Sequence, residues 1–251
     1  MQKGRLLKLS TELSTEKYYD QIADGYDVVS ERRRLYNSAV DHEISFIRKN
    51  KKSDIMLDIG SGNGLRAKKL SQAMGVKKLY LSDISNKMLN LCRHNVPGSE
   101  TIDLKSTSLE SLDISFDIIT MQWNVLGHVS SFNDRVKLLE HCRNRLASGG
   151  QVFLDINNRH NIIYGKLRVL MRCIIDYCLP NYERGNTLIG VQSNGKSVKG
   201  FGHLFTLNEI RNIVAKSGLK ISKINYFDYE CGTIRKHFFQ GQIFCVLEAG
   251  E

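Results

Sequence analysis

The segment from Leu57 to Gly64, which reads LDIGSGNG, decides the fold of this 251-residue chain. The apolar run that begins at Ile55 predicts a short buried strand, and Leu65 to Met74 has the apolar spacing of a helix. Glycines between a strand and a helix let the backbone approach a ligand closely, and the helix N-terminus offers amide donors to an anion such as a carboxylate. The segment therefore predicts a ligand-binding turn at the end of the first strand.

Strand-like and helix-like segments alternate on both sides of this turn. Two helices are expected before it, at Tyr18 to Ala23 and at Leu35 to Arg48. The elements expected after it are a strand at Leu79–Leu81, a helix at Lys87–Asn95, a weak strand at Glu100–Leu104, a strand at Phe116–Met121, a helix at Arg135–Leu146 and a strand at Val152–Ile156. This alternation predicts an α/β protein with a doubly wound, mostly parallel sheet.

The pattern changes after Asp155. Asn161 to Cys178 has the spacing of a basic helix with an apolar face, and two strand-like runs then flank Asn194-Gly195. Asn-Gly between two such runs indicates a β-hairpin, because both residues accept a positive φ. The alternation resumes with a helix at Leu207–Ser217 and with strands near Leu219–Phe227 and Phe239–Leu247.

We expect a single domain, because the chain has only two prolines, no flexible linker and no internal repeat. Its parts are an N-terminal helical cap (about 10–50), a cofactor-binding core (about 54–156), a helix-and-hairpin lid inserted after the fifth strand (about 157–203), and a closing helix with strands (about 204–248).

The composition of the chain limits its expected partners, location and metal content. The formal charge of +10 favours polyanionic partners such as RNA, yet the basic residues are dispersed along the chain. The N-terminal segment lacks the apolar block of a secretory signal and no apolar run is long enough for a membrane span, so we expect a cytoplasmic protein without membrane contact. The closest of the six cysteines, Cys173 and Cys178, lack the spacing of zinc or redox pairs, and no metal is expected.

A second acidic residue, Asp83, ends the second strand about 20 residues after the glycines. A carboxylate there can accept hydrogen bonds from both hydroxyls of a ribose. The acidic Asp58 lies before the glycines, and glycine recurs at every second position rather than as GxGxxG. In these features the chain resembles the class I S-adenosylmethionine (SAM) dependent methyltransferases.

Further matches run along residues 15 to 227. Tyr18 to Asp27 looks like the YDxIAxxYD segment that precedes the core in many small-molecule methyltransferases, and Met121 to His128 is similar to a segment of the glycine N-methyltransferase-like enzymes. Gly202 to Ile210, with Thr206 as a helix cap, resembles the closing element of small-molecule methyltransferases of the type 11 and type 25 branch. The third motif departs from the pattern, because Ser108 replaces the usual acidic residue and the backbone of Leu109 has to substitute.

The resemblance implies a Rossmann-like, seven-stranded sheet and SAM as the cofactor. The expected cofactor contacts are Tyr19, Tyr26, Asp58, Gly60, Ser61, Gly62, Gly64, Asp83, Ile84, Met88, Ser108, Leu109, Gln122, Trp123 and Asn124. For Trp123, a purely structural role in the core remains an equal alternative.

Two histidines follow strand ends where an acceptor would lie, His128 and His160. Either could act as a general base, which the reaction needs only if the acceptor is an alcohol or a protonated amine. A hydrogen-bonded structural role is the alternative for His128, and the start of the next helix is the alternative for His160. The residues expected to contact the acceptor are Tyr18, Asn157, Tyr164, Arg168, Tyr177, Tyr182 and Phe201.

Three functions remain open. The first is transfer of a methyl group to nitrogen or oxygen of a small molecule in metabolite or natural-product biosynthesis. The second is methylation of RNA or tRNA, which the net charge and the basic helix around Arg168 favour. The third is SAM binding without catalysis by a regulator. The absence of Asn-Pro-Pro-Tyr and of Pro-Cys argues against methylation of base amino groups and of pyrimidine C5. The sequence leaves the choice between monomer and homodimer open.

Overall fold

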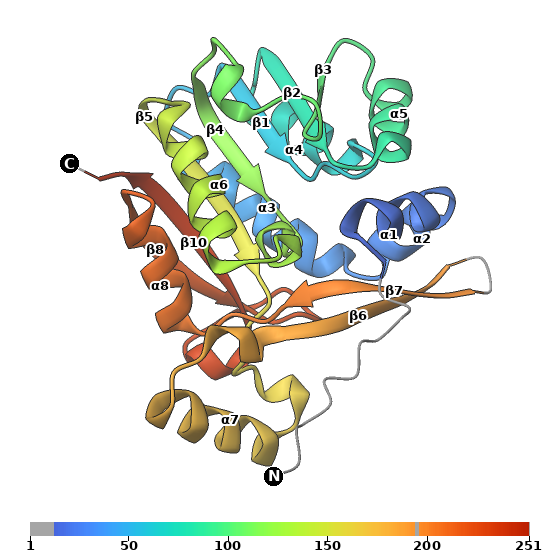
Figure 1. The fold of residues 1–251 in the computed structure, drawn as a ribbon. Coiled ribbons are helices and arrows are strands. Elements are labelled where there is room, and N and C mark those ends of the chain that lie inside the picture. The colour runs from blue at the N-terminus through green and yellow to red at the C-terminus, as the bar shows by residue number, and fades with distance from the viewer. Residues whose placement is uncertain (1–12, 194–195, 251) are drawn as a thin grey trace.

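The computed structural model describes residues 13–193 and 196–250. Its main sheet has the strand order β3-β2-β1-β4-β5-β10-β8-β9 (Figure 1). The strands are β1 (Ile55–Ile59), β2 (Lys78–Asp83), β3 (Glu100–Asp103), β4 (Phe116–Met121), β5 (Leu146–Ile156), β8 (Leu219–Phe227), β9 (Ile234–Arg235) and β10 (Gln242–Ala249). The first five strands are parallel, and β10 is antiparallel to both of its neighbours. The doubly wound, mostly parallel sheet is thus confirmed, with the two-residue β9 added to the seven expected strands.

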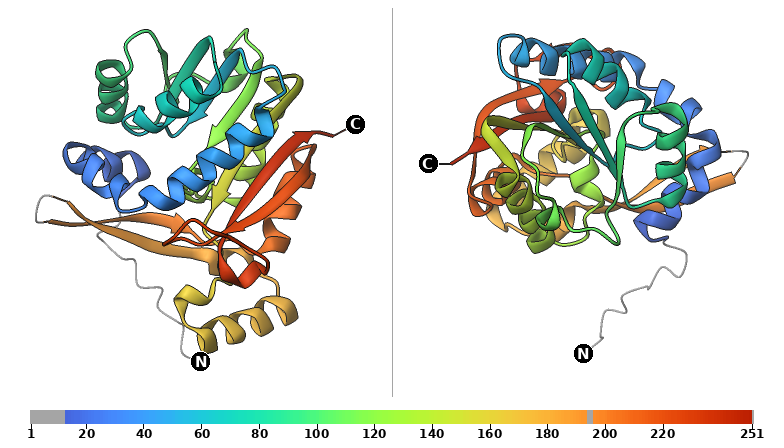
Figure 2. Two further views of the ribbon diagram at one scale, coloured as in Figure 1. Left: turned by 180° about the vertical axis from the view of Figure 1, so that it is seen from behind. Right: turned by 90° about the horizontal axis from the view of Figure 1, so that it is seen from above.

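Helices cover both faces of this sheet because its strands are apolar on both sides. In chain order, the α-helices of the described residues are α1 (Thr15–Ile22), α2 (Tyr26–Glu31), α3 (Arg34–Arg48), α4 (Leu65–Ala73), α5 (Asn86–Asn95), α6 (Phe132–Asn144), α7 (Lys166–Cys178) and α8 (Leu207–Lys216). Apolar residues of α3, α4 and α5 pack on one face, seen in front in the left view of Figure 2. Those of α6 and α8 pack on the other. Each large apolar side chain buried in this way contributes about 1.5–3 kcal/mol.

Several boundaries differ from the expected ones. The N-terminal cap holds three helices rather than two, because Gly25 separates α1 from α2 and the chain turns again at Arg33. Helix α6 begins at Phe132, where the Ser131 hydroxyl accepts a hydrogen bond from a backbone amide of the first turn. Strand β5 begins at Leu146, since the two glycines after it form an irregularity within the strand instead of ending a helix.

The inserted segment forms a separate two-stranded sheet from β6 (Asn186–Ser193) and β7 (Lys196–His203). The two strands pair antiparallel, as a hairpin requires; the expected Asn194-Gly195 turn lies outside the described residues. The hairpin passes along α1 and α2 at the carboxyl edge of the main sheet (Figure 1). Gly200 of β7 contacts the Tyr18 ring so closely that a Cβ would lie 2.7 Å from it, so only glycine fits there.

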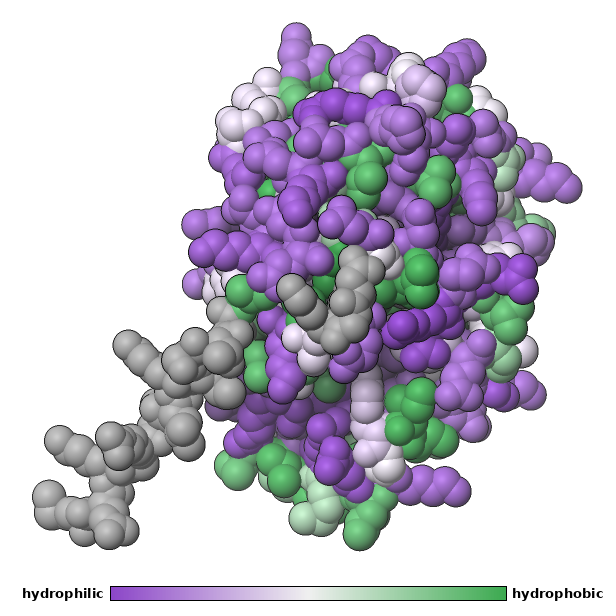
Figure 3. Space-filling model, turned by 90° about the vertical axis from the view of Figure 1, so that its right-hand side faces the viewer, coloured by the Kyte–Doolittle hydropathy of each residue, from purple (hydrophilic) through white to green (hydrophobic). Residues whose placement is uncertain are grey.

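Helix α7 lies apart from the hairpin, at the lower end of the molecule in Figure 1. Its apolar residues Leu167 and Leu170 are 74% and 57% exposed, and apolar side chains gather at that end in Figure 3. The rest of the face in Figure 3, around α1 and the hairpin, is mostly hydrophilic. No helix within the described residues combines the length and the apolar character that a membrane span requires.

Candidate active site

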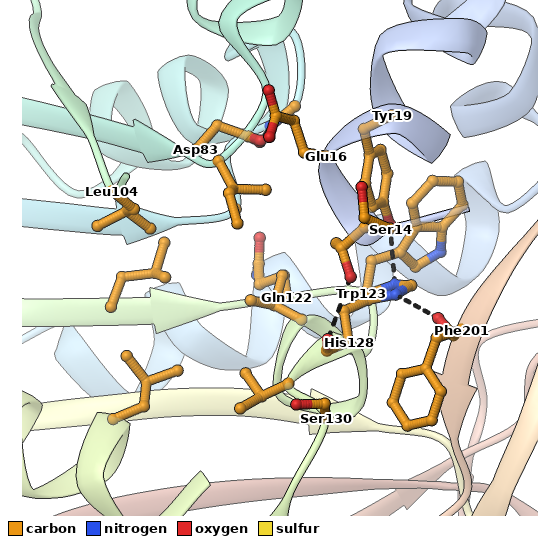
Figure 4. A pocket seen from close by; sticks show the side chains of 18 of the residues that line it. Ser14, Glu16, Tyr19, Asp83, Leu104, Gln122, Trp123, His128, Ser130 and Phe201 are labelled. Carbon is orange, nitrogen blue, oxygen red and sulfur yellow. Dashed lines mark hydrogen bonds between the residues drawn. The ribbon is translucent and has the colours of Figure 1, made fainter. Parts of the chain in front are cut away.

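A central cavity of about 840 Å³ opens at the carboxyl ends of β1, β2 and β4. The glycine turn and Asp83 form one side of it, and α1 with the hairpin residue Phe201 forms the other (Figure 4). Trp123 and Gln122, which follow β4, lie between these sides. The cavity therefore has the place that ligands occupy in open α/β sheets.

Asp83 is 4% exposed at the tip of β2. One of its oxygens accepts a hydrogen bond from the Gly62 amide at 3.0 Å, and the other accepts one from the Ser85 amide at 2.9 Å. Burial raises the pKa of this carboxyl to about 6, although these amide donors favour its charged form. A carboxylate has about four acceptor sites, so two remain for the hydroxyls of a ribose.

Asp58 lies at the end of β1, where it accepts a hydrogen bond from the Thr120 hydroxyl. Burial raises its pKa to about 6 as well. It borders a second cavity, here called the α3 cavity, which lies between α3 and α4 and is also lined by Ser61, Arg34 and Arg66.

The glycine turn itself is bonded within the protein. The amides of Gly60 and Ser61 both donate to the Ser82 carbonyl, at 2.8 and 2.9 Å, and the Gly62 amide donates to Asp83. The expected anion site at the start of α4 thus has fewer free amides than the sequence indicated. The turn instead allows close approach, because Tyr26 lies directly over Gly62, which has a φ of +56°. Near the turn, the arginines of the α3 cavity are paired with carboxylates, Arg34 with Glu31 and Arg66 with Asp41.

Trp123 and Asn124 both adopt left-handed backbone conformations, with φ of 63° and 62°. Such angles are rare outside glycine and indicate a functional constraint. The Asp155 side chain at the end of β5 accepts hydrogen bonds from both backbone amides, and burial raises the pKa of its carboxyl. The Asn124 side chain binds the His203 carbonyl at 3.2 Å and the Asn157 amide at 2.9 Å. Its bonds therefore hold the hairpin base to the sheet.

His128 and Tyr19 form a hydrogen-bonded pair in the wall of the central cavity (Figure 4). The His128 Nδ1 lies 3.0 Å from the Phe201 carbonyl, which can only accept, so Nδ1 carries the proton. The Nε2 then accepts from the Tyr19 hydroxyl at 2.9 Å. Burial lowers the pKa of His128 to about 4, and the ring is neutral at physiological pH.

A third cavity, here called the arginine cavity, adjoins the central one and has a volume of about 340 Å³. It shares Tyr19, Trp123 and His128 with the central cavity. Its other walls come from α1, the α2–α3 turn, β6 and the loop after β8. These walls include Arg32, Arg33, Tyr18, Asn157, Ile189, Val191 and Tyr229.

The structure brings most of the predicted site residues to these three cavities. Those that line the central cavity are Tyr19, Tyr26, Gly60, Gly62, Asp83, Ile84, Gln122, Trp123, His128 and Phe201. Of the three cavities, Asp58 and Ser61 line only the α3 cavity. Tyr18, Asn124 and Asn157 line only the arginine cavity.

Other predicted cofactor contacts lie behind the cavity surface. Gly64 is the N-cap residue of α4, Met88 is fully buried on α5, and Leu109 belongs to the core. Ser108 caps a short helical turn by accepting from the Glu110 amide at 3.2 Å.

Apart from Asn157 and Phe201, the predicted residues of the inserted segment lie elsewhere. His160 contacts Asp176 of α7 through Nε2 at 3.0 Å, within a cluster that also holds Arg159. Tyr182 stacks on Phe132. The remaining ones line none of the three cavities; they are Tyr164, Arg168 and Tyr177, the last of which is 86% exposed.

Sequence reasoning missed the arginines that border the cavities. In the sequence, the run Arg32 to Arg34 counts only among the dispersed basic residues. In the structure, Arg34 lines the α3 cavity, and Arg32 and Arg33 line the arginine cavity. Their place directly after the tyrosine-rich segment was the available signal. Tyr229 gave no such signal in the sequence, because it lies in the loop after β8 and outside the motifs considered.

Comparisons with known proteins agree with this geometry. A family model described as a methyltransferase domain matches residues 56–150. A search of curated proteins finds no significant match. Among solved structures, a SAM-dependent methyltransferase from Clostridium acetobutylicum ATCC 824 has a TM-score of 0.64 at 15% identity, with 93% of this chain and 99% of that chain covered. The CcbJ methyltransferase from Streptomyces caelestis has a TM-score of 0.65 at 16% identity, with 93% and 98% covered.

A third similar structure is the sugar N-methyltransferase KedS8 from Streptoalloteichus sp ATCC 53650, with a TM-score of 0.60, 12% identity, and 100% of this chain and 99% of that chain covered. At these identities the likeness concerns the fold, while the family match concerns the half of the sheet that holds Asp58 and Asp83. Residues 56–150 therefore match the model of a methyltransferase domain, and the chain has the fold of the solved SAM-dependent methyltransferases.

Proposed function

We propose that the protein transfers a methyl group from SAM to nitrogen or oxygen of a small-molecule acceptor. The observation that carries this proposal is the cover over the carboxyl edge of the sheet. Helix α1 and β7 pack against each other at Tyr18 and Gly200, so the central cavity has a wall on its acceptor side. A walled cavity suits a small molecule, whereas a nucleic acid needs an open basic groove.

The proposed placement of SAM follows the charges in the cavities. Asp83 accepts from the ribose hydroxyls, and the methionine portion passes Gly60, which borders both the central and the α3 cavity. Leu104 and Ile84 offer apolar contacts to the adenine at the other end. The bound cofactor supplies a methyl carbon activated by positively charged sulfur.

The protein then has to position the acceptor and keep water away. Tyr19, Trp123 and His128 line both the central and the arginine cavity, so they border the region where the two reactants meet. In the hydrogen-bonded pair of His128 and Tyr19, the basic atom is the Nε2 of His128, and the Tyr19 hydroxyl donates to it. With a hydroxyl acceptor, Tyr19 would pass the acceptor's proton to His128; with a neutral amine, no base is needed.

The test combines binding and transfer. S-adenosylhomocysteine (SAH) binding is measured by calorimetry, and radiolabelled SAM is then incubated with small-molecule fractions of cell extract and, separately, with bulk tRNA. We expect label in a small-molecule fraction with the wild type and a large loss with Asp83→Asn. Label in tRNA with a steep salt dependence would favour the nucleic-acid function instead. SAH binding with no transfer to any pool would favour a regulator.

Methylation of RNA has one supporting observation, the formal charge of +10. The basic residues Lys166 and Arg168 that favoured it lie on α7, which lines neither the central nor the arginine cavity. The small-molecule function therefore has the stronger support.

A further inference from the structure

We propose that the arginine cavity binds an anionic group of the acceptor, a carboxylate or a phosphate. This inference rests on the proposed function and adds the chemical class of its substrate. The acceptor would combine an apolar body with the anion, while its methylated atom lies where the arginine cavity meets the central one.

The arginine cavity has cations and no acids in its wall. Arg32 and Arg33 lie at the turn between α2 and α3, and none of the residues that line the cavity is an aspartate or a glutamate. The neighbouring Arg34 pairs with Glu31, and Arg66 pairs with Asp41. Within the described residues, neither Arg32 nor Arg33 has a carboxylate within 4.0 Å.

Arg33 is held in place without a salt bridge. It is half-buried, and its guanidinium carbon lies 4.1 Å from the centre of the Tyr229 ring. Stacking on an aromatic face fixes the plane of a guanidinium and leaves its N–H groups at the edge free to donate. Those groups match the paired oxygens of a carboxylate or phosphate.

The positive charge extends beyond the cavity rim. Burial raises the pKa of Tyr164, and the charges of Arg172 and Arg33 oppose this rise. Arg172 of α7 lies over the Tyr164 ring at 5.7 Å. Cations from two separate elements of the fold, Arg33 and Arg172, thus lie near Tyr164.

The rest of the cavity suits an apolar body. Ile22 and Val29 come from the N-terminal helices, and Ile189 and Val191 come from β6. The Nε1 of Trp123 is buried and has no hydrogen-bond partner among the residues that the structure describes. Trp123 lines all three cavities, so its side chain lies beside the region where the acceptor would meet the cofactor.

The experiment uses pairs of probes that differ in charge, with the full chain saturated with SAH. Benzoate is compared with benzamide, and phenyl phosphate with phenol, by ligand-observed NMR and calorimetry. We expect each anion to bind at least tenfold more tightly than its neutral partner. A preference for benzoate identifies a carboxylate as the group bound, and a preference for phenyl phosphate identifies a phosphate.

Arg33→Gln should weaken binding of the preferred anion at least tenfold and change binding of its neutral partner less than twofold. Arg33→Lys should retain part of the preference because it keeps the charge. The matched control is Arg93→Gln. Arg93 bonds Thr101 of β3 and Asn90 of α5, outside the three cavities. SAH affinity of every variant reports that it is folded.

Two failures can be told apart. A wild-type protein that does not bind SAH contradicts the proposed function. If SAH binds but the anions bind no better than their neutral partners, or if nothing binds at all, the anionic class is wrong. The same conclusion follows if Arg33→Gln weakens both members of a pair equally.

Discussion

Replacing Asp83 with asparagine should separate cofactor binding from folding. The substitution keeps the size of the side chain and one of its two acceptor oxygens. In the folded protein, Asp83 already accepts from the Gly62 and Ser85 amides. The amide nitrogen of asparagine would face one of these donors, and it could no longer accept from a ribose hydroxyl.

The size of the effect follows from these bonds. A hydrogen bond to a charged group contributes about 1.5–3 kcal/mol, so the loss of the carboxylate should weaken SAH binding roughly ten- to more than a hundredfold. Stability should change much less. The variant avoids burying a charge whose pKa is raised to about 6, and this gain opposes the loss of one amide contact.

The same carboxyl predicts how cofactor affinity depends on pH. Asp83 is ionised above its pKa of about 6 and accepts well there, so wild-type affinity for SAH should be constant above pH 7 and fall below pH 6. Asp58 titrates in the same range, and the variant should therefore keep a shallower dependence. Calorimetry from pH 8 to pH 5, with thermal unfolding as the control, measures both. A folded Asp83→Asn protein that binds SAH within threefold of wild type would refute the assignment of the ribose site.

Three further substitutions test other parts of the site. Gly62→Ala places a Cβ 2.6 Å from the Tyr26 hydroxyl at a φ of +56°, and calorimetry should show weaker SAH binding together with a loss of about 1–2 kcal/mol in unfolding free energy. Arg135→Ala leaves the buried Glu209 without its cation and should cost about 3–5 kcal/mol in denaturant unfolding, whereas a loss below 1 kcal/mol would contradict the pairing. His128→Ala should leave SAH affinity within a few-fold; if the acceptor is a hydroxyl, turnover should fall about a hundredfold or more, and with an amine of low pKa the rate should be unchanged.

The cofactor side of the site could be predicted from the sequence because its signals are local. Asp58, the glycine turn and Asp83 each follow directly from a strand end, and parallel strands bring their carboxyl ends to one edge. The free amides expected at the turn were a different matter. They are bonded to Ser82 of the neighbouring strand, and the spacing within one segment does not report such a bond.

The acceptor side could be predicted only in part, since it depends on how distant segments pack. The apolar face of α7 predicted a helix, but periodicity does not state what that face contacts, and Tyr177 and Leu167 point to solvent. The left-handed pair after β4 is likewise set by a tertiary partner, Asp155, about 30 residues later in the sequence. Arg33 and Tyr229 meet only because the N-terminal cap packs against the end of the sheet.

The hairpin is bonded to the main sheet at its root. Its root is tied to the sheet through the His203 and Phe201 carbonyls, which bind Asn124 and His128. Toward the tip, β6 and β7 bond to each other and rest on the short helices of the N-terminal cap. These bonds at the root fix the wall that both reactants share. Substitutions in β6 and β7 away from this root would then alter which molecules fit without disturbing the atoms that align the transfer.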